Sequence, residues 1–287
     1  MDIITFHVSL DSDESVHPNQ TLKDREYFLM VWMMFSSARL FHRKVSTIML
    51  TDEKTEFKGL PRTVKYVRSE VDPEKLMLAR TIAQLKYVQH HEFSTPLVFV
   101  DSDILFNATL SPIFEMDFDV ALTWRTNAEM PINGGLLILN NIRPHVSKLF
   151  FERFVKIYRD KYSDSAAWFG DQLALRDCAG VDFSQISGLE IVEADGVRVL
   201  LLPCDTYNFS PRNLYSEIST NLSNKTVLHF KGERKRLMPI FWNLWLAPRR
   251  AMRPWLKVLS VLERRWLSKQ VELEQRTTFN KSENKII

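Results

Sequence analysis

Short apolar runs and helix-spaced apolar stripes alternate along this chain. The short runs, which are typical of strands, lie at residues 3–9, 45–51, 63–67, 96–100, 120–123, 136–139, 197–202 and 226–230. Stripes with the spacing of one helix face lie between them, at residues 21–41, 73–88 and 144–162. Strands that alternate with helices predict an α/β sheet covered by helices.

The helical stripes predict which side chains are buried. The run Tyr27 to Phe35 is too short to span a bilayer and predicts a buried helix. Pro73 predicts the start of the next helix. In the helix at 144–162 the stripe predicted to face the core is Val146, Leu149, Phe150, Phe154 and Ile157.

The run at 96–100 is apolar without interruption, which predicts a strand buried on both faces. It ends at Asp101-Ser102-Asp103. Ligands of open α/β sheets bind beyond the carboxyl ends of the strands, so we expect both aspartates at a ligand site. Two carboxylates this close can hold Mg²⁺ or Mn²⁺, which would neutralise a diphosphate. The plainer interpretation of such a pair is a solvated turn.

Length and charge indicate one large domain with a basic end. We expect a catalytic domain at residues 1–245 and a basic, tryptophan-rich helical appendage with a polar tail at 246–287. The formal net charge is +3, yet residues 249–269 hold seven basic residues and one acidic residue, a net charge of +6. This concentration argues against nucleic-acid binding and for one surface that meets an anionic partner or a membrane.

The two cysteines exclude several classes of protein. Cys178 and Cys204 are too few for a disulfide framework, and the absence of a C-x-x-C pair argues against zinc or redox chemistry. The chain begins with a predicted strand rather than a basic, apolar leader. We therefore expect a cytoplasmic protein, with peripheral attachment to the cytoplasmic face of a membrane as an extension.

A second cluster of polar residues follows the strand at 226–230. His229 begins the pattern H-x-x-G-x-x-K, completed by Gly232 and Lys235. Imidazole is a good ligand for Mn²⁺-like metals, glycine lets backbone approach phosphate, and lysine supplies a mobile positive charge. A structural histidine at a strand end is the plainer interpretation.

Two further segments carry polar groups, and the first of them is suited to hydrogen-bonding sugar hydroxyls. Asn133-Gly134-Gly135 offers an amide and a flexible backbone just before a predicted strand, and Gly170-Asp171-Gln172 offers a carboxylate beside an amide. The plainer interpretations are an ordinary turn and a helix N-cap, respectively.

Taken in their order along the chain, the four motifs resemble those of family 8 glycosyltransferases over roughly residues 1–245. The resemblance implies a GT-A fold, a mixed central sheet flanked by helices, and retaining transfer of a hexose from a nucleotide-diphosphate sugar, usually UDP-linked, to a glycan or lipid-linked acceptor. It also implies Mn²⁺ or Mg²⁺ as cofactor, with Asp101, Asp103 and His229 as ligands.

The resemblance assigns the other motif residues to the donor. Gly232 and Lys235 would contact the diphosphate, and Ser102 and Gly135 would line the donor site. Asn133, Gly134 and Asp171 would hold the donor sugar. Gln172 matches the residue proposed as nucleophile or as stabiliser of an oxocarbenium-like transition state. Arg80 resembles an arginine that contacts the donor, and Lys86 takes its place in an alternative alignment. Asn208 matches a recurrent position near the acceptor.

The chain departs from the family in two places. Arg236-Leu237 follows the last motif where members usually have Pro-Trp, and His7-Val8-Ser9 stands where many members carry acids near the nucleotide base. No second carboxylate is obviously available as a general base, so the leaving phosphate itself can accept the acceptor's proton. Charge on the departing diphosphate would then be stabilised electrostatically.

The appendage has two interpretations. Trp255, Leu259, Leu262 and Trp266 lie on one side of a predicted helix with basic residues around them. Such a helix suits an anionic membrane surface or packs on the catalytic domain.

Three other functions remain. An inverting GT-A transferase would use Asp171 as base, and a nucleotide-sugar-binding protein would keep the fold without the chemistry. A haloacid dehalogenase-like phosphohydrolase also places Asp-x-Asp after an apolar strand, but normally follows it with a small pair such as Gly-Thr rather than Ile104-Leu105.

Overall fold

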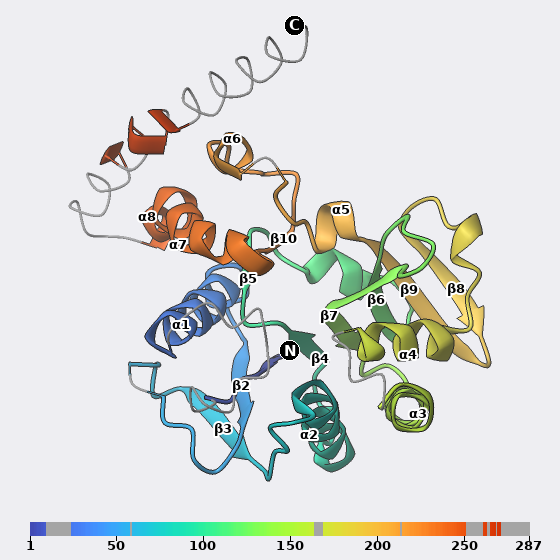
Figure 1. The fold of residues 1–287 in the computed structure, drawn as a ribbon. Coiled ribbons are helices and arrows are strands. Elements are labelled where there is room, and N and C mark those ends of the chain that lie inside the picture. The colour runs from blue at the N-terminus through green and yellow to red at the C-terminus, as the bar shows by residue number, and fades with distance from the viewer. Residues whose placement is uncertain are drawn as a thin grey trace, which may run out of the picture.

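The computed structural model describes residues 1–9, 24–57, 59–163, 169–212, 214–250, 261–262, 265–267 and 269–270. Its helices and strands follow one another as β1 (Asp2–Phe6), α1 (Asp24–Phe41), β2 (Ser46–Thr51), β3 (Val64–Arg68), α2 (Leu76–His90), β4 (Leu97–Val100), β5 (Ile104–Phe106), β6 (Val120–Trp124), β7 (Ile132–Leu139), α3 (Pro144–Ile157), α4 (Gly170–Ala179), β8 (Glu190–Ala194), β9 (Val197–Pro203), α5 (Cys204–Tyr207), α6 (Leu214–Ile218), β10 (Val227–His229), α7 (Leu237–Phe241) and α8 (Ala247–Arg250). Figure 1 shows their arrangement.

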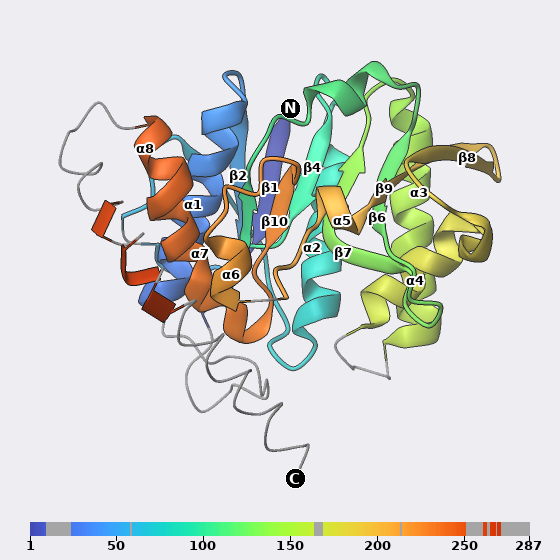
Figure 2. The ribbon, with the colours of Figure 1, turned by 90° about the horizontal axis from the view of Figure 1, so that it is seen from above.

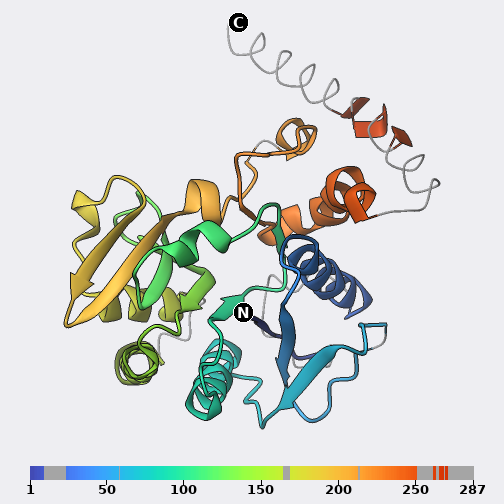
Figure 3. The same cartoon turned by 180° about the vertical axis from the view of Figure 1, so that it is seen from behind.

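Eight strands form one mixed sheet in the order β3-β2-β1-β4-β7-β6-β9-β8, and β5 pairs with β10 in a second, two-stranded sheet. The strands β3, β2, β1 and β4 are parallel to one another, whereas β7 runs against both of its neighbours. In the view from behind, the blue end of the large sheet and its yellow end lie on opposite sides of the molecule (Figure 3). The chain leaves β1 outward through β2 and β3 and returns on the other side as β4, so the topological switch point lies between β1 and β4.

Helices cover both faces of the large sheet (Figure 2). The core on one face joins α1 and α7 to the small sheet, and the core on the other face joins α2, α3 and α4. Because strand side chains alternate between faces, Val98 and Val100 of β4 join the first core and Leu97 and Phe99 the second. All four are buried, as the uninterrupted apolar run predicted.

Several predicted boundaries differ from the structure. In α3 the predicted core residue Leu149 is 61% exposed, and Phe151 and Val155 are buried instead. Helix α2 begins three residues after Pro73. Strand β7 begins at Ile132, so Asn133-Gly134-Gly135, expected just before the strand, is part of it, and the alternative of an ordinary turn is wrong. The buried face of α3 could not be predicted from spacing, because aromatic side chains lie on more than one of its faces. The start of β7 could not be predicted because glycine pairs are more typical of turns.

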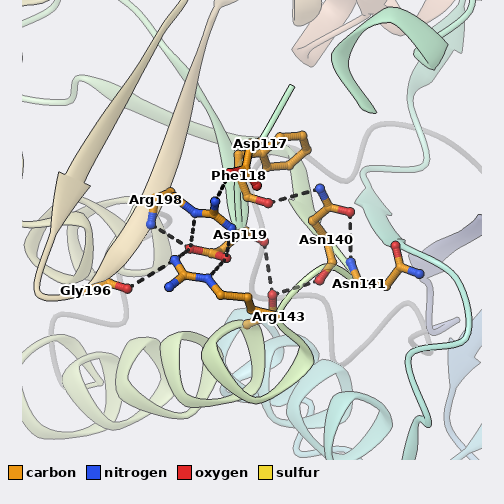
Figure 4. Close-up of polar contacts among 9 residues, drawn as sticks. Asp117, Phe118, Asp119, Asn140, Asn141, Arg143, Gly196 and Arg198 are labelled. Carbon is orange, nitrogen blue, oxygen red and sulfur yellow. Dashed lines mark hydrogen bonds and ion pairs between the residues drawn. The ribbon is translucent and has the colours of Figure 1, made fainter. Parts of the chain in front are cut away.

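A buried carboxylate ties three elements together at the end of the sheet opposite the motifs (Figure 4). The side chain of Asp119, just before β6, is fully buried and makes ion pairs with Arg143, at the start of α3, and with Arg198 of β9. It also accepts a hydrogen bond of 2.7 Å from the backbone N–H of Arg198. Asp117, which is 70% exposed, binds the same Arg198. The cluster joins the sheet to the helix that covers it.

Part of the predicted C-terminal appendage packs on the domain. Leu267 is 2% exposed and belongs to the core that contains α1 and α7, and the ring of Trp266 meets that of Tyr215 edge to face at 5.5 Å. Val261 and Leu262 are about half exposed, at 48% and 54%. Residues 251–260, with Trp255 and Leu259 of the predicted stripe, and residues 271–287 lie outside the described part. Within the described part, no helix combines the length and apolarity needed to cross a bilayer.

Candidate metal centre and adjoining cavity

Pairing between β5 and β10 brings the two halves of the candidate metal site together. Asp101, Ser102 and Asp103 form the turn between β4 and β5. Since β5 pairs with β10, His229 lies opposite Ile104, and the backbone N–H of Phe230 donates to the carbonyl of Asp103 at 2.9 Å. A histidine 126 residues away in sequence thus reaches the Asp-x-Asp turn.

The three predicted ligands converge. One ligand atom from each of Asp101, Asp103 and His229 lies within 4.8 Å of the other two. The imidazole Nε2 lies 3.1 Å from Asp103 Oδ1 and 3.6 Å from Asp101 Oδ2. Two carboxylate oxygens and one imidazole nitrogen are the donor set that Mn²⁺ accepts, and Mg²⁺ favours the same oxygens.

Hydrogen bonds behind the ring assign the tautomer of His229. Its Nδ1 lies 2.8 Å from Oδ1 of Asn208, an oxygen that can only accept, so Nδ1 carries the proton. The amide of Asn208 is oriented by its own Nδ2, which donates at 2.8 Å to Oγ1 of Thr123 and at 2.8 Å to Oδ1 of Asn133. Nε2 is therefore the ring nitrogen that faces the two carboxylates, and in a neutral imidazole it can bind a cation together with them. The residues fit a divalent metal.

Lys235 lies on the α1 side of this centre. Its Nζ is 3.5 Å from Asp103 Oδ2 and 5.7 Å from the ring centre of Tyr27. Burial by itself would raise the pKa of Asp103, but His229 and Lys235 outweigh it and hold this pKa at about 2. Gly232, whose φ is +55°, turns the chain between His229 and Lys235 in a conformation that favours glycine.

Arg80 of α2 joins the metal centre to the start of α4. Its guanidinium donates to Asp101 Oδ1 at 2.8 Å and to Asp171 Oδ2 at 2.5 Å. Burial raises the pKa of Asp171, Arg80 opposes the rise, and Asp101 adds to it. The Asp171 side chain is 4% exposed and its Oδ1 has no hydrogen-bond partner in the described part of the protein. A buried carboxylate oxygen is thus available to a ligand hydroxyl.

Two glycines of β7 allow these groups to approach. A Cβ on Gly134 would lie 2.9 Å from Asp171 Oδ2. A Cβ on Gly135 would lie 2.5 Å from the ring of His229, which is closer than real Cβ contacts. Position 135 therefore requires glycine if the imidazole is to reach the aspartates.

A cavity of about 310 Å³ opens at the switch point between β1 and β4. Its wall is apolar and aromatic near the end of β1 and polar near the metal centre. Burial lowers the pKa of His7, in the apolar part, to about 4, so this ring is neutral at pH 7. The lining residues are Phe6, His7, Val8, Tyr27, Leu76, Met77, Arg80, Asp101, Ser102, Asp103, Arg125, Asn133, Gly134, Gly135, Phe169, Asp171, Gln172, His229, Lys231, Gly232 and Lys235.

All but two of the residues predicted for the site line this cavity. Lys86 does not, because it lies two turns further along α2 and borders a different hollow beside β2 and β3. Of the two alternatives, Arg80 is thus the basic side chain that reaches the site. Asn208 does not line the cavity either: it is 2% exposed and lies behind His229. It holds the imidazole instead of facing the cavity.

Sequence reasoning missed two cations in the cavity wall. Lys231 lies two residues after His229, and Arg125 follows β6. Burial lowers the pKa of Lys231, Cys204 opposes this, and the positive charge of Arg125 lowers it further. The alternation of side chains after His229 predicts Lys231 on the cavity side. Nothing local distinguishes Arg125, whose place depends on the pairing of β6 with β7 and β9.

Comparison with known proteins supports the fold. No family model and no curated protein sequence matches the chain. Among solved structures, the chain resembles the glycosyltransferase GlyE of Streptococcus pneumoniae TIGR4, with a TM-score of 0.51 and 13% identity over 94% of this chain and 64% of GlyE. It resembles the bifunctional glycosyltransferase WbbM with a TM-score of 0.51 and 14% identity over 89% of this chain and 50% of WbbM. The galactosyltransferase LgtC, solved with donor and acceptor sugar analogs, gives 0.49 and 14% over 81% of this chain and 88% of LgtC.

At these identities the likeness is one of fold. The chain has the mixed α/β architecture of GT-A glycosyltransferases, as predicted from its sequence.

Proposed function

We propose that this protein is a metal-assisted glycosyltransferase of the family 8 type, which moves a hexose from a UDP-linked sugar to a hydroxyl of a glycan or lipid-linked acceptor with retention of configuration. The convergence of Asp101, Asp103 and His229 within 4.8 Å at the switch point of a GT-A sheet carries this proposal. Open α/β sheets bind nucleotides at such switch points.

Asp101, Asp103 and His229 would hold Mn²⁺ or Mg²⁺. When bound, the metal would neutralise charge on a departing diphosphate. Lys235 lies beside Asp103 and brings a second positive charge to the same place. The backbone at Gly232, with no side chain, leaves room for phosphate oxygens. These groups are preorganised in a partly buried cavity, where electrostatic stabilisation is most effective.

Asp171, Asn133 and Arg80 would hold the donor sugar. The free Oδ1 of Asp171 can accept a hydrogen bond from a sugar hydroxyl, while Arg80 fixes its other oxygen. Gln172 follows Asp171 in the cavity wall, and its Oε1 is buried without a hydrogen-bond partner among the described residues. An amide oxygen in this position suits stabilisation of an oxocarbenium-like sugar.

Retention follows if the leaving group serves as the base. The bond from the sugar C1 to the phosphate oxygen breaks, a bond from C1 to the acceptor oxygen forms on the same face, and the acceptor proton moves to the departing phosphate. The inverting alternative needs Asp171 as a general base. Its buried ion pair with Arg80 disfavours that role, because it holds the carboxylate against a fixed partner.

A panel of nucleotide sugars with Mn²⁺ tests the proposal. We expect slow donor hydrolysis and a rise in melting temperature with one donor, both lost in Asp103→Ala. Binding without hydrolysis or transfer would indicate a nucleotide-sugar-binding protein. Release of phosphate from phosphomonoesters in place of sugar transfer would indicate the phosphohydrolase alternative. The anomeric configuration of the product, read by NMR, separates retention from inversion.

We also propose peripheral attachment to an anionic membrane through residues 249–269. The support is their net charge of +6 and the exposed side chains of Val261 and Leu262. The burial of Leu267 supports the alternative in which this helix packs on the domain. Co-sedimentation with vesicles of phosphatidylglycerol, compared with phosphatidylcholine vesicles, separates the two. Equal recovery in both supernatants at low salt would contradict attachment.

A further inference from the structure

The cavity wall contains two cations that the donor and the metal do not require. Its lining holds four basic side chains, Arg80, Arg125, Lys231 and Lys235, and three acidic ones, Asp101, Asp103 and Asp171. Arg80 pairs with Asp101 and Asp171, and Lys235 pairs with Asp103. All three acids are therefore engaged by two of the four bases.

Arg125 and Lys231 are the remaining two. In the described part of the protein neither makes an ion pair with a carboxylate. The Nε of Arg125 donates to the backbone carbonyl of Met130 at 2.8 Å, which fixes the guanidinium without neutralising it. Each side chain is half-buried. Two like charges in one partly buried wall repel each other, and an anion between them relieves the repulsion.

Arg125 and Lys231 make different contacts from those of Lys235. The ammonium of Lys235 is near Tyr27 of α1. Arg125 and Cys204 instead follow the carboxyl ends of β6 and β9, which are parallel neighbours with Trp124 opposite Pro203. Lys231 is close enough to both Arg125 and Cys204 to interact electrostatically with them. Arg125 therefore lies at the carboxyl ends of β6 and β9 rather than beside α1, and Lys231 lies near both Arg125 and the acids of the metal centre.

The donor does not account for this pair. Its diphosphate would be neutralised by the divalent metal and Lys235. Its sugar would contact Asp171, and a negatively charged sugar beside that carboxylate would be repelled. The group that meets Arg125 and Lys231 must then belong to the second substrate.

We propose, on the basis of the function proposed above, that the acceptor is an anionic saccharide whose carboxylate or phosphate group is bound between Arg125 and Lys231. The planar guanidinium of Arg125 can bind either group through two hydrogen bonds, and Lys231 adds a point charge. Phe169, 41% exposed at the cavity wall, offers an apolar surface on which a sugar ring can lie. Arg125 and Lys231 would therefore determine acceptor specificity.

Calorimetry with saturating UDP and Mg²⁺ tests this proposal. The probes are glucose, glucuronate and glucose 6-phosphate, which differ in charge at one carbon. We expect at least one of the charged sugars to bind about tenfold or more tightly than glucose. The charged sugar that binds more tightly identifies the acceptor group as carboxylate or phosphate. The double variant Arg125→Gln/Lys231→Gln should abolish the preference, and Lys231→Arg alone should keep most of it.

The double variant Arg62→Gln/Lys65→Gln removes two exposed positive charges outside the cavity and is the matched control. It should keep the preference, and melting temperatures check that each variant folds. Equal affinity of wild type for all three sugars would overturn the proposal, as would a preference that survives the double variant. Charged sugars that bind only without UDP would assign the pair to the diphosphate instead.

Failure of this inference is distinguishable from failure of the proposed function. If wild type hydrolyses a nucleotide sugar but does not prefer charged sugars, only the acceptor assignment is wrong. If no nucleotide sugar binds or is hydrolysed with Mn²⁺, the proposed function itself is wrong.

Discussion

Asn208 lies outside the cavity but orients His229, a predicted metal ligand, inside it. Its amide oxygen accepts a hydrogen bond from Nδ1 of His229, and its amide nitrogen donates to Thr123 and Asn133. Partners of this kind fix the tautomer and the ring orientation of a metal-binding histidine. Asn208 is thus a positioning residue, and Asn133 contributes to the same network while lining the cavity.

We expect Asn208→Ala to lower Mn²⁺ affinity by about 10- to 100-fold, the usual effect of removing such a partner. The variant also leaves the buried Nδ1–H of His229 without its acceptor, which costs about 1–3 kcal/mol of folding stability. Titration calorimetry with Mn²⁺ measures the first effect and urea unfolding the second. Asn141→Ala, at a half-exposed position, is the control. Unchanged Mn²⁺ affinity in folded Asn208→Ala would show that the network does not orient the ring.

Gly135→Ala tests the close approach of β7 to the imidazole. The new Cβ would lie 2.5 Å from the ring of His229, so either the ring or the strand must move. We expect Mn²⁺ affinity to fall more than about tenfold. In Gly188→Ala the new Cβ meets nothing within 4 Å, and affinity should stay as in wild type. Equal Mn²⁺ binding by the two variants would contradict the model of the site.

The cluster around Asp119 shows how single residues join elements. Strands β6 and β9 are parallel neighbours, and α3 covers them from one face. Arg198 binds Asp119 from within the sheet and Arg143 from the start of the helix. The N–H of Asn140, at the end of β7, donates to the Asp119 carbonyl at 2.8 Å. The cluster therefore fixes how α3 sits on the sheet, away from the metal centre.

Asp119→Ala should lower the free energy of unfolding by about 1–3 kcal/mol, because it removes a charged acceptor of hydrogen bonds from Arg143 and from the side chain and backbone of Arg198. Asp117→Ala removes an exposed carboxylate from the same Arg198 and should cost less than about 1 kcal/mol. Urea unfolding followed by circular dichroism compares the two. Similar losses in both variants would mean that burial of Asp119 contributes little.

The same carboxylate predicts acid sensitivity. Burial opposes ionisation of Asp119, but hydrogen bonds from Arg143 and Arg198 lower its pKa below the ordinary value of 3.8. A depressed folded-state pKa stabilises the protein above the unfolded pKa, and this stabilisation is lost as the pH falls through the folded pKa. Wild type should therefore lose stability more steeply than Asp119→Asn below about pH 4. Parallel pH profiles of the two proteins would count against this.

At the scale of the whole molecule, the described part of the C-terminal segment packs on the α/β domain through one buried side chain. Leu267 is buried in the core shared with α1 and α7, whereas Leu262 is 54% exposed. Leu267→Ala should destabilise the domain by about 2–5 kcal/mol, and Leu262→Ala by less than about 0.5 kcal/mol. Thermal unfolding of both variants measures this. A negligible effect of Leu267→Ala would favour a segment free to lie on a membrane.

Much of the architecture could be predicted from local patterns. The uninterrupted run before Asp101 predicted β4 and its burial on both faces, and the run at 27–35 predicted a buried helix. Helix α4 and strand β8 were not predicted. A helix N-cap was only the plainer interpretation of Gly170, Asp171 and Gln172, which form the first turn of α4, and β8 is an edge strand without a fully buried side chain.

One part of the candidate site could likewise be predicted from local sequence, and the rest could not. Asp101 and Asp103 are neighbours in sequence, so a strand that ends in two acids determines their place by itself. The other parts of the site depend on strand pairing between distant segments. These are the approach of His229 to the two aspartates, the hydrogen bond to Asn208 that orients its ring, and the pair of cations formed by Arg125 and Lys231. A strand's side-chain period specifies which face a residue occupies but not which partner it meets. That choice is made only when β5 pairs with β10 and β6 with β9, because packing of the whole core selects those pairings.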